Sequence, residues 1–295
     1  MNTAKVIATD LDGTLFYPRK RIKMIPKDSR RFLEHFIDDG GRLVLVSGRN
    51  RYFGEKVGHN LKRSIDIIGC NGAFVTCNNM LIQEKCFPVD ELKQMLKEVR
   101  REYHFMVVSL FCRHRNLVVD TGIMNWRTRF GYRFYQFIQG VYREPALMSD
   151  KVFYEELEKG EVYKVLLIVG ILPRDKQKAQ QITDALSKAY PDMVFAWTDQ
   201  AIEVTPKGCS KSSGLAFYLD YNKISSDNIL VVGDSGNDIS MFEAYQPTSF
   251  CMAHSPKDVQ KHAAHIIQRF SDLKKYIYPS VEIDNPQDKN NLKGH

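Results

Sequence analysis

Short apolar segments alternate with segments of helical periodicity at both ends of this chain, and this alternation is the strongest constraint on its fold. Residues 5–9 and 42–46 read as buried strands, and residues 27–39 between them space apolar side chains by three and four, as one face of a helix does. Further strands are predicted at 65–68 and 228–232, and a further helix at 211–221. Such alternation is typical of a parallel sheet with crossover helices. We therefore predict an α/β fold, with a Rossmann-like parallel sheet core and helices on both faces.

The pattern changes between residues 84 and 205, where strand-like runs follow one another in hairpin style among helices. The predicted strands are 105–111, 116–120, 162–169, 193–197 and 201–204, and the predicted helices are 89–103, 124–137, 145–157 and 174–189. This mixture is typical of a separate α+β module. A chain of 295 residues is also about twice the length of a typical domain. We predict a core made of 1–83 and 206–283, an inserted domain at 84–205 and a polar tail at 284–295.

Composition excludes several classes of protein. The chain is 43% hydrophobic and 26% charged, which is ordinary for a globular protein and unlike a disordered or collagenous chain. Its longest apolar run, residues 165–172, is far shorter than the roughly 18 residues that span a bilayer, and the N-terminus lacks the pattern of a signal peptide. Six cysteines form no Cys-x-x-Cys pair, as expected of reduced thiols. We expect a cytoplasmic protein without a membrane partner, as a monomer or a weak homodimer.

The net charge of +7 is concentrated in one region, because seven arginines accompany two acidic residues between Arg100 and Arg133. A basic surface suits an anionic ligand, either nucleic acid or a phosphorylated metabolite, although it can equally be a solvated face. No zinc-finger, RNA-recognition or helix-turn-helix motif accompanies the charge. We therefore do not expect nucleic acid to be the partner.

Two pairs of aspartates follow predicted strands. Asp10 and Asp12 are two residues apart, a spacing that puts both carboxylates on one side of an extended chain, and they would repel without a cation or a proton between them. Asp234 and Asp238 follow the strand at 228–232. Ligands of open α/β sheets bind at the carboxyl edge of the strands, so these acids can converge on one cation. Oxygen ligands alone favour Mg²⁺.

Three other groups of polar residues bear on the site. Ser47-Gly48-Arg49 ends the second strand and offers a hydroxyl, backbone N–H groups and a guanidinium to an anion. Lys207 and Lys211 lie where the parallel pattern resumes, and either can supply a fixed positive charge. The histidines are expected on a polar, helical stretch as surface or packing residues; they are His254, His262 and His265.

Together these groups resemble the four motifs of the haloacid dehalogenase-like superfamily. In order along the chain, the matching residues are Asp10-Leu-Asp12-Gly-Thr14, Ser47, Lys211 and Gly233-Asp234-Ser-Gly-Asn237-Asp238. Cys70-Asn71-Gly72-Ala73 and the run from Lys207 to Lys211 resemble the Cof-type branch, which inserts a large α+β cap between the second and third motifs. The resemblance covers residues 5 to about 270 and identifies residues 84–205 as a cap that selects the substrate.

The resemblance implies a Mg²⁺-dependent phosphatase of small phosphorylated metabolites, such as sugar phosphates. Asp10 would be the nucleophile that forms an aspartyl-phosphate, and Asp12 would serve as acid and then base. The implied metal ligands are Asp10, the Asp12 carbonyl and Asp234, with Asp238 or Asn237 in support. The implied phosphate-binding residues are Ser47, Gly48, Arg49, Asn71, Lys211 and Asn237, with Lys211 preferred to Lys207 because it begins a helix.

Two alternatives stay open from the sequence: a phosphomutase of the same superfamily, and a non-catalytic regulatory protein that uses a phospho-Asp site. Dehalogenation is not expected, because the superfamily's dehalogenases lack an acid at the position of Asp12. In the cap, the basic candidates for contact with the substrate are Arg113, His114, Arg115, Arg127 and Arg129. Aromatic candidates are Tyr132, Phe134 and Tyr135, for which packing in a helix or core is the competing explanation.

Overall fold

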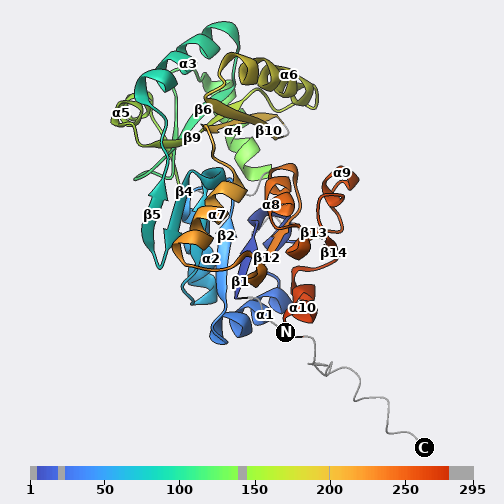
Figure 1. Cartoon of the computed structure of the whole chain (residues 1–295). Helices are drawn as coiled ribbons and strands as arrows, with labels where there is room; N and C mark the ends of the chain where they lie inside the picture. The colour runs from blue at the N-terminus through green and yellow to red at the C-terminus, as the bar shows by residue number, and fades with distance from the viewer. Residues whose placement is uncertain (1–4, 19–23, 139–144, 199, 279–295) are drawn as a thin grey trace, which may run out of the picture.

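A computed structural model describes residues 5–18, 24–138, 145–198 and 200–278, and within these residues the strands form two sheets (Figure 1). The order of the first sheet is β14 (His265–Ile267), β13 (Ser249–Met252), β12 (Ile229–Gly233), β1 (Val6–Thr9), β2 (Arg42–Val46), β3 (Asp66–Gly69), β4 (Phe74–Cys77) and β5 (Met80–Glu84). Strands β14 to β3 are parallel, and β4 and β5 add an antiparallel hairpin at one edge.

The second sheet is formed by strands that lie between the two halves of the first sheet in the sequence. Its order is β10 (Met193–Thr198), β11 (Ala201–Pro206), β9 (Val162–Ile168), β6 (Val107–Cys112), β7 (Leu117–Val119) and β8 (Ala146–Met148). The pairs are antiparallel except β7 with β8. We refer to this sheet and its helices as the cap and to the first sheet and its helices as the core; the domain boundaries at 83 and 206 stay a prediction, and the tail at 284–295 lies outside the described residues.

Helices cover both faces of the core sheet, as predicted, and both faces of β1 are buried beneath them. Ile7 packs with residues of α1 (Lys27–Asp38) and α2 (Arg51–Leu61), whereas Val6 and Ala8 pack on the other face with α7 (Lys211–Tyr221) and α8 (Ile239–Ala244). All four residues of β1 are buried. Two short helices, α9 (Lys257–Gln260) and α10 (Lys274–Ile277), follow near the end of the described chain. A strand that is apolar on both sides is expected at the centre of such a sheet.

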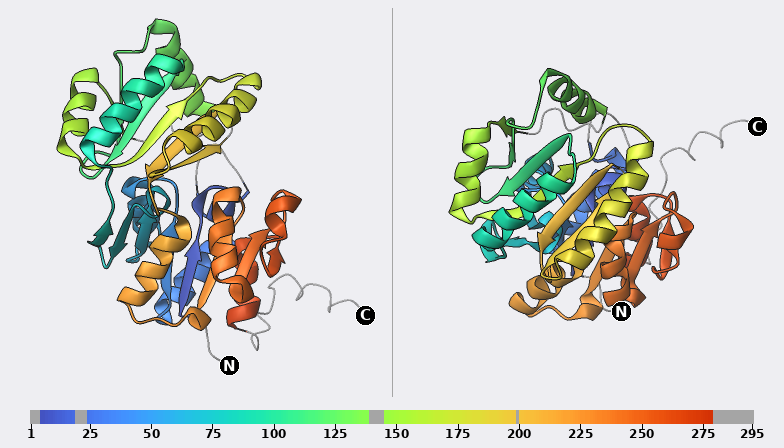
Figure 2. Two further views of the ribbon diagram at one scale, coloured as in Figure 1. Left: turned by 45° about the horizontal axis from the view of Figure 1, so that its top comes forward. Right: turned by 90° about the horizontal axis from the view of Figure 1, so that it is seen from above.

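The cap sheet is covered unequally on its two faces (Figure 2). Helices α3 (Val89–Glu102), α5 (Asp150–Lys159) and α6 (Arg174–Ala189) pack on the face away from the core. The other face, together with α4 (Trp126–Ile138), packs against the core through a cluster that joins Val107 and Ile168 of the cap to Ile67 and Phe74 of the core. The cap sheet therefore lies directly above the carboxyl edge of the core sheet.

Several elements differ from the sequence-based prediction. The helix expected at 145–157 is wrong at its start, since Ala146–Met148 pairs with β7 as a strand and the helix begins only after Ser149, whose hydroxyl accepts a hydrogen bond from the Val152 N–H at 3.3 Å. The polar stretch expected to be helical around the three histidines is also mostly wrong: only Lys257–Gln260 is α-helical, and His265 lies in β14. Helix α2 and strands β4, β5, β13 and β14 are additional elements. The additional strands form because they pair with strands from other parts of the chain, which local periodicity does not report.

Candidate active site

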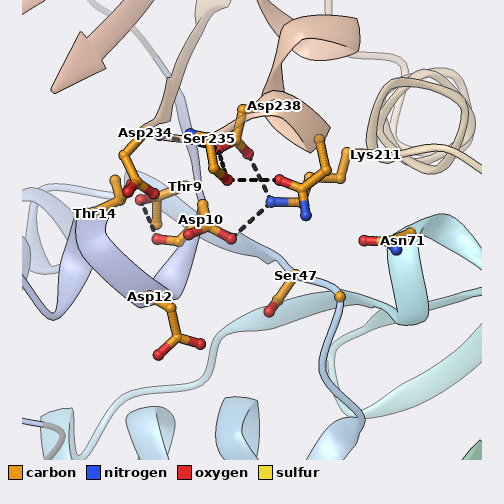
Figure 3. A network of polar contacts seen from close by, with 12 residues as sticks. Thr9, Asp10, Asp12, Thr14, Ser47, Asn71, Lys211, Asp234, Ser235 and Asp238 are labelled. Carbon is orange, nitrogen blue, oxygen red and sulfur yellow. Dashed lines mark hydrogen bonds and ion pairs between the residues drawn. The ribbon is translucent and has the colours of Figure 1, made fainter. Parts of the chain in front are cut away.

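Three buried carboxylates meet at the carboxyl edge of the core sheet (Figure 3). Asp10 directly follows β1 and Asp234 directly follows β12, and these two strands are paired in parallel, with the Asp10 N–H bonded to the Val232 carbonyl at 2.9 Å. Asp238 comes one turn after Asp234. One oxygen of each of the three carboxylates lies within 4.8 Å of the others. Adjacent strands that end at the same edge therefore bring together acids that are more than 200 positions apart in the sequence.

Lys211 is the cation within this group. It begins α7, capped by Ser210, and its side chain is buried. Its Nζ donates to Asp10 Oδ1 at 2.7 Å and to Asp238 Oδ1 at 2.6 Å. Burial by itself would lower the pKa of Lys211, but the charges of Asp10 and Asp238 raise it above its usual range, so the side chain stays an ammonium.

Lys207, the other candidate lysine, points elsewhere. Its side chain is 65% exposed and its Nζ pairs with Asp192 at 2.6 Å, on the loop that precedes β10. The geometry thus places Lys211, and not Lys207, among the carboxylates.

Among the buried groups of the site, the three carboxylates outnumber the lysine. Burial raises the pKa of Asp10 to about 8, and although Lys211 acts against this shift, the carboxylates of Asp238, Asp234 and Asp12 add to it. A single ammonium among three buried carboxylates leaves an excess of negative charge, which a divalent cation with oxygen ligands would remove. The donor set, made of carboxylate oxygens alone, fits Mg²⁺ better than zinc.

Both oxygens of Asp238 already accept hydrogen bonds. Oδ1 binds Lys211, and Oδ2 accepts from the N–H groups of Asp234 and Ser235, both at 3.0 Å, and from the Ser235 hydroxyl at 3.2 Å. The Asp10 carboxylate accepts a hydrogen bond from Lys211 through Oδ1. Asp238 is thus placed to hold the turn and the lysine.

Asp12 does not lie on an extended strand beside Asp10. Strand β1 ends at Thr9, and Asp12 belongs to the turn Leu11–Leu15, where its carboxylate pairs with the Arg49 guanidinium through Nε. Its carboxylate is outside the group of three, so among its atoms the main-chain carbonyl stays the predicted metal ligand. The turn requires glycine at position 13, since φ is +87° there and an added Cβ would come within 2.2 Å of Asp234 Oδ2.

The turn after β2 holds the predicted phosphate-binding residues. Ser47 is buried, and its Oγ accepts a hydrogen bond from the Arg49 N–H at 3.2 Å. The Arg49 guanidinium lies over the Phe53 ring at 4.2 Å and binds Asp12, so in this structure it orients that carboxylate. Gly48 lies between them and allows the chain to approach Asn71, whose Oδ1 is 3.0 Å from an added Cβ.

Asn71 and Asn237 approach the site from two other turns. Asn71 has a φ of +56°, and its main-chain N–H donates to the Ser47 carbonyl at 3.0 Å while its Nδ2 donates to Glu203 Oε2 at 2.7 Å. Asn237 is exposed beside Asp238 and accepts a hydrogen bond from the Ser235 hydroxyl at 2.9 Å.

Three side chains near the site were not singled out from the sequence as site residues. His254 Nε2 lies 3.4 Å from Asp234 Oδ2, and its ring stacks on Tyr17 with the centroids 4.0 Å apart. The apolar run of β13, which ends two residues before His254, is the signal that could have placed it at the same edge as Asp234. The other two residues, Lys164 and Glu203, come from cap strands and contact the turns at Gly48 and Asn71.

The cap residues proposed to contact the substrate lie in different surroundings. Arg113 pairs with Glu84 and with Glu161, the latter at 2.7 Å, and Arg115 pairs with Glu156 at 3.0 Å. His114 is exposed and lies 3.7 Å from Glu161. Arg127, Arg129 and Phe134 are exposed on α4, whereas Tyr132 is buried between cap and core. The side chain of Tyr135 is not among those that the structure describes. Arg113 and Arg115 are therefore engaged in ion pairs.

The sequence is similar to known proteins over most of its length. The sequence profile described as haloacid dehalogenase-like hydrolase matches residues 7–272. The pyridoxal phosphate phosphatase YbhA of Escherichia coli (strain K12) is 26% identical over 270 residues, which cover 90% of this chain and 93% of that protein.

Among the residues that the structure describes, none of the helices is both long and apolar enough to cross a bilayer.

Two solved structures share the fold. A HAD/COF-like hydrolase from Plasmodium vivax superposes with a TM-score of 0.77 at 19% identity, covering 94% of this chain and 96% of that one. The HAD subclass IIB sugar phosphatase BT4131 superposes with a TM-score of 0.70 at 22% identity, covering 92% and 98% of the two chains.

Proposed function

The chain belongs to the haloacid dehalogenase-like hydrolase family, in its Cof-type branch, and is a phosphatase; from this premise we propose that it hydrolyses phosphate monoesters of small metabolites through an aspartyl-phosphate on Asp10. The observation that carries the proposal is that the carboxylates of Asp10 and Asp234, which follow two paired strands, lie close together at one sheet edge, with Lys211 Nζ bonded to Asp10 Oδ1. The buried Asp10 carboxylate is thereby held in place by the Lys211 ammonium. The neighbouring carboxylates of Asp234 and Asp238 leave negative charge that a metal cation would neutralise.

Mg²⁺ is the metal that these residues fit. The Asp10 and Asp234 carboxylates and the main-chain carbonyl of Asp12 would hold it, while Asp238 keeps Lys211 in place. When bound, Mg²⁺ would neutralise negative charge on the carboxylates and on the phosphoryl group. The excess of acidic groups around Asp10 supports this assignment.

The reaction then proceeds in two steps on Asp10. An Asp10 oxygen attacks phosphorus, an O–P bond to the carboxylate forms, and the ester P–O bond breaks as Asp12 gives a proton to the leaving alkoxide. Asp12 then takes a proton from water, which attacks the phosphorus of the aspartyl-phosphate, releases inorganic phosphate and restores the Asp10 carboxylate. Arg49 pairs with Asp12 and fixes the position of this side chain in the turn.

The phosphoryl group would be held by residues from separate turns. Lys211 supplies the fixed positive charge, and the Ser47 hydroxyl supplies a hydrogen bond to a phosphoryl oxygen. We expect the backbone at Gly48 and the amides of Asn71 and Asn237 to add hydrogen bonds to the phosphoryl group. Because phosphoryl transfer depends mainly on positioning and charge neutralisation, this arrangement suits it.

The proposed substrates are small phosphorylated metabolites, with sugar phosphates as the first candidates. Two similar proteins support this class: one is named a pyridoxal phosphate phosphatase and the other a sugar phosphatase. The cap, which packs directly on the phosphate-binding turns, would enclose the leaving group and exclude water from the first step.

The test is a phosphate-release assay over phosphorylated sugars, nucleotides and cofactors, with Mg²⁺ and with a chelator. We expect release that needs Mg²⁺ and that disappears in Asp10→Asn, while thermal unfolding shows that this variant folds. Formation of an isomeric phosphosugar without release of phosphate would instead indicate a phosphomutase. Turnover that persists in Asp10→Asn or in chelator would contradict the mechanism.

A further inference from the structure

The turn Ser47-Gly48-Arg49 has three successive main-chain carbonyls, and each is held by a different partner. The Ser47 carbonyl accepts from the Asn71 N–H at 3.0 Å and the Arg49 carbonyl accepts from the Cys70 N–H at 2.9 Å, both within the core. The Gly48 carbonyl between them accepts from Lys164 Nζ, which comes from β9 of the cap. The middle carbonyl of the phosphate-binding turn is therefore held across the boundary between cap and core.

Lys164 is fixed in a buried position by its own surroundings. Its side chain is 3% exposed, and its Nζ pairs with Glu203 Oε1 at 3.1 Å and lies 4.4 Å from the centre of the Phe111 ring. Glu203, from β11, also accepts from Asn71 Nδ2 at 2.7 Å. Burial would raise the pKa of Glu203, but Lys164 and Asn71 outweigh it and the pKa is lowered, so the Glu203 carboxylate stays charged. A buried ion pair is costly unless further hydrogen bonds support it, as they do here.

The peptide unit between Gly48 and Arg49 connects this lysine to Ser47. A trans peptide is planar, so its C=O and its N–H point in opposite directions. The C=O of this unit points to Lys164, and its N–H, which belongs to Arg49, points back to Ser47 Oγ at 3.2 Å. Rotation of this one peptide plane would break both contacts together.

We propose that Lys164 is a positioning residue for phosphoryl binding: by holding the Gly48 carbonyl, it keeps the Arg49 N–H on Ser47 Oγ and so directs the Ser47 hydroxyl proton toward the phosphoryl oxygen. A serine hydroxyl has one proton to donate and two lone pairs to accept. With one lone pair engaged by the Arg49 N–H, the proton turns to another acceptor. The inference rests on the proposed function, because it assigns this acceptor to the substrate's phosphoryl group.

A second contact of the same turn links its geometry to the position of the cap. Asn50 directly follows Arg49, is buried, and donates from Nδ2 to the carbonyls of Cys112 at 3.2 Å and Asn116 at 2.8 Å, in the turn between β6 and β7 of the cap. The cap thus binds the turn at both Gly48 and Asn50. Lys164 and the chain between β6 and β7 both belong to the cap, so the geometry of the Ser47 turn depends on contacts from the cap.

The experiment compares Glu203→Gln with the double variant Lys164→Met/Glu203→Gln. Neither keeps the buried carboxylate, so removing the lysine leaves no unpaired negative charge at Glu203, and the two proteins differ only by the ammonium at the Gly48 carbonyl. Lys188→Met, an exposed lysine on α6 of the cap, is the control for loss of a positive charge. Hydrogen exchange at the Arg49 amide is measured by NMR, together with the affinity for inorganic phosphate in the presence of Mg²⁺.

We expect the Arg49 amide to exchange about tenfold faster, or more, in the double variant than in Glu203→Gln, as loss of a hydrogen bond from a charged donor implies. In the double variant, the dissociation constant for phosphate should rise by a similar factor, and KM should rise more than kcat falls. Lys164→Arg, which keeps a positive charge at this position, should retain part of the affinity for phosphate. Lys188→Met should match the wild type, and exchange in β1 should be the same in all variants.

Equal Arg49 exchange in the two variants would overturn the inference, and so would faster exchange with unchanged phosphate affinity. The exchange measurement does not depend on turnover. A protein that releases no phosphate from any substrate but still shows the Lys164-dependent exchange would contradict the proposed function and leave the contact of Lys164 with the turn standing.

Discussion

Replacing Asp234 or Asp238, the two acids after β12, by asparagine separates their two proposed roles, which are metal binding for Asp234 and support of Lys211 for Asp238. Asp238→Asn removes a carboxylate whose side chain is fully buried and whose two oxygens accept from Lys211 and from three further donors. An asparagine can offer only one oxygen, and its NH₂ group would face donors. Asp234→Asn, in contrast, keeps an oxygen for the Thr14 hydroxyl, which donates to Asp234 Oδ1 at 3.2 Å.

The expected magnitudes differ accordingly. Breaking a buried ion pair by removing one partner costs about 3–5 kcal/mol, which for a chain of this size corresponds to a fall in Tm of roughly 6–20 °C. For Asp234→Asn in metal-free buffer we expect a change within about 1 kcal/mol, since a charge that adds to the repulsion around Asp10 is removed. Mg²⁺ at 100 times its dissociation constant would stabilise the wild type by about 2.7 kcal/mol.

The assay is thermal unfolding of the wild type and both variants, in chelator and in Mg²⁺. Asp238→Asn should lose most stability in chelator yet still gain from Mg²⁺, whereas Asp234→Asn should resemble the wild type in chelator and gain little from Mg²⁺. The reasoning would be refuted if Asp234→Asn were the less stable variant in chelator, or if it kept the full gain from Mg²⁺.

Three further predictions follow from single groups. Asp12→Asn should slow hydrolysis of alkyl phosphates by roughly 10²–10⁴-fold but p-nitrophenyl phosphate much less, because a good leaving group hardly needs a proton; equal losses in kcat would argue against an acid role. Lys211→Met should abolish turnover and destabilise the fold, whereas Lys207→Met, at an exposed ion pair, should change neither; a loss of phosphate release in Lys207→Met would reverse the assignment. Burial, with a contribution from Glu84, raises the pKa of the Cys86 thiol to about 11, so that thiolate is scarce at pH 8 and alkylation, followed by mass spectrometry, should accelerate as the pH rises toward 11; rapid labelling at pH 7 would contradict this.

Much of the candidate site could be predicted from local sequence, because its residues follow apolar strands. Asp10, Ser47 and Asp234 each come at or near the end of a buried run, and strand periodicity is a property of a few neighbouring residues. Helices α6 and α7 have the predicted bounds for the same reason. The strand at Ala146–Met148 was missed because only its partner β7, far along the chain, makes it a strand.

Sequence spacing also does not show which partners charged side chains take in the fold. Arg49 was expected to bind phosphate, and in the structure it binds Asp12 and covers Phe53. Arg113 was a candidate for the substrate, and it pairs with Glu84 and Glu161. A long cation reaches whichever carboxylate the packing brings near, and sequence spacing carries no information on contacts between distant segments.

By itself, then, the sequence determined which chemical groups leave the carboxyl edge of the core sheet, because the parallel strands of one sheet end on the same side. Only the tertiary structure decided how those groups are paired. Lys211, and not the exposed Lys207, pairs with Asp10 and Asp238. Lys164 reaches the Gly48 carbonyl from the cap. These contacts join residues that are distant in the chain, and they form only after two separate sheets have packed and excluded water, which is what makes a buried charge choose its partner.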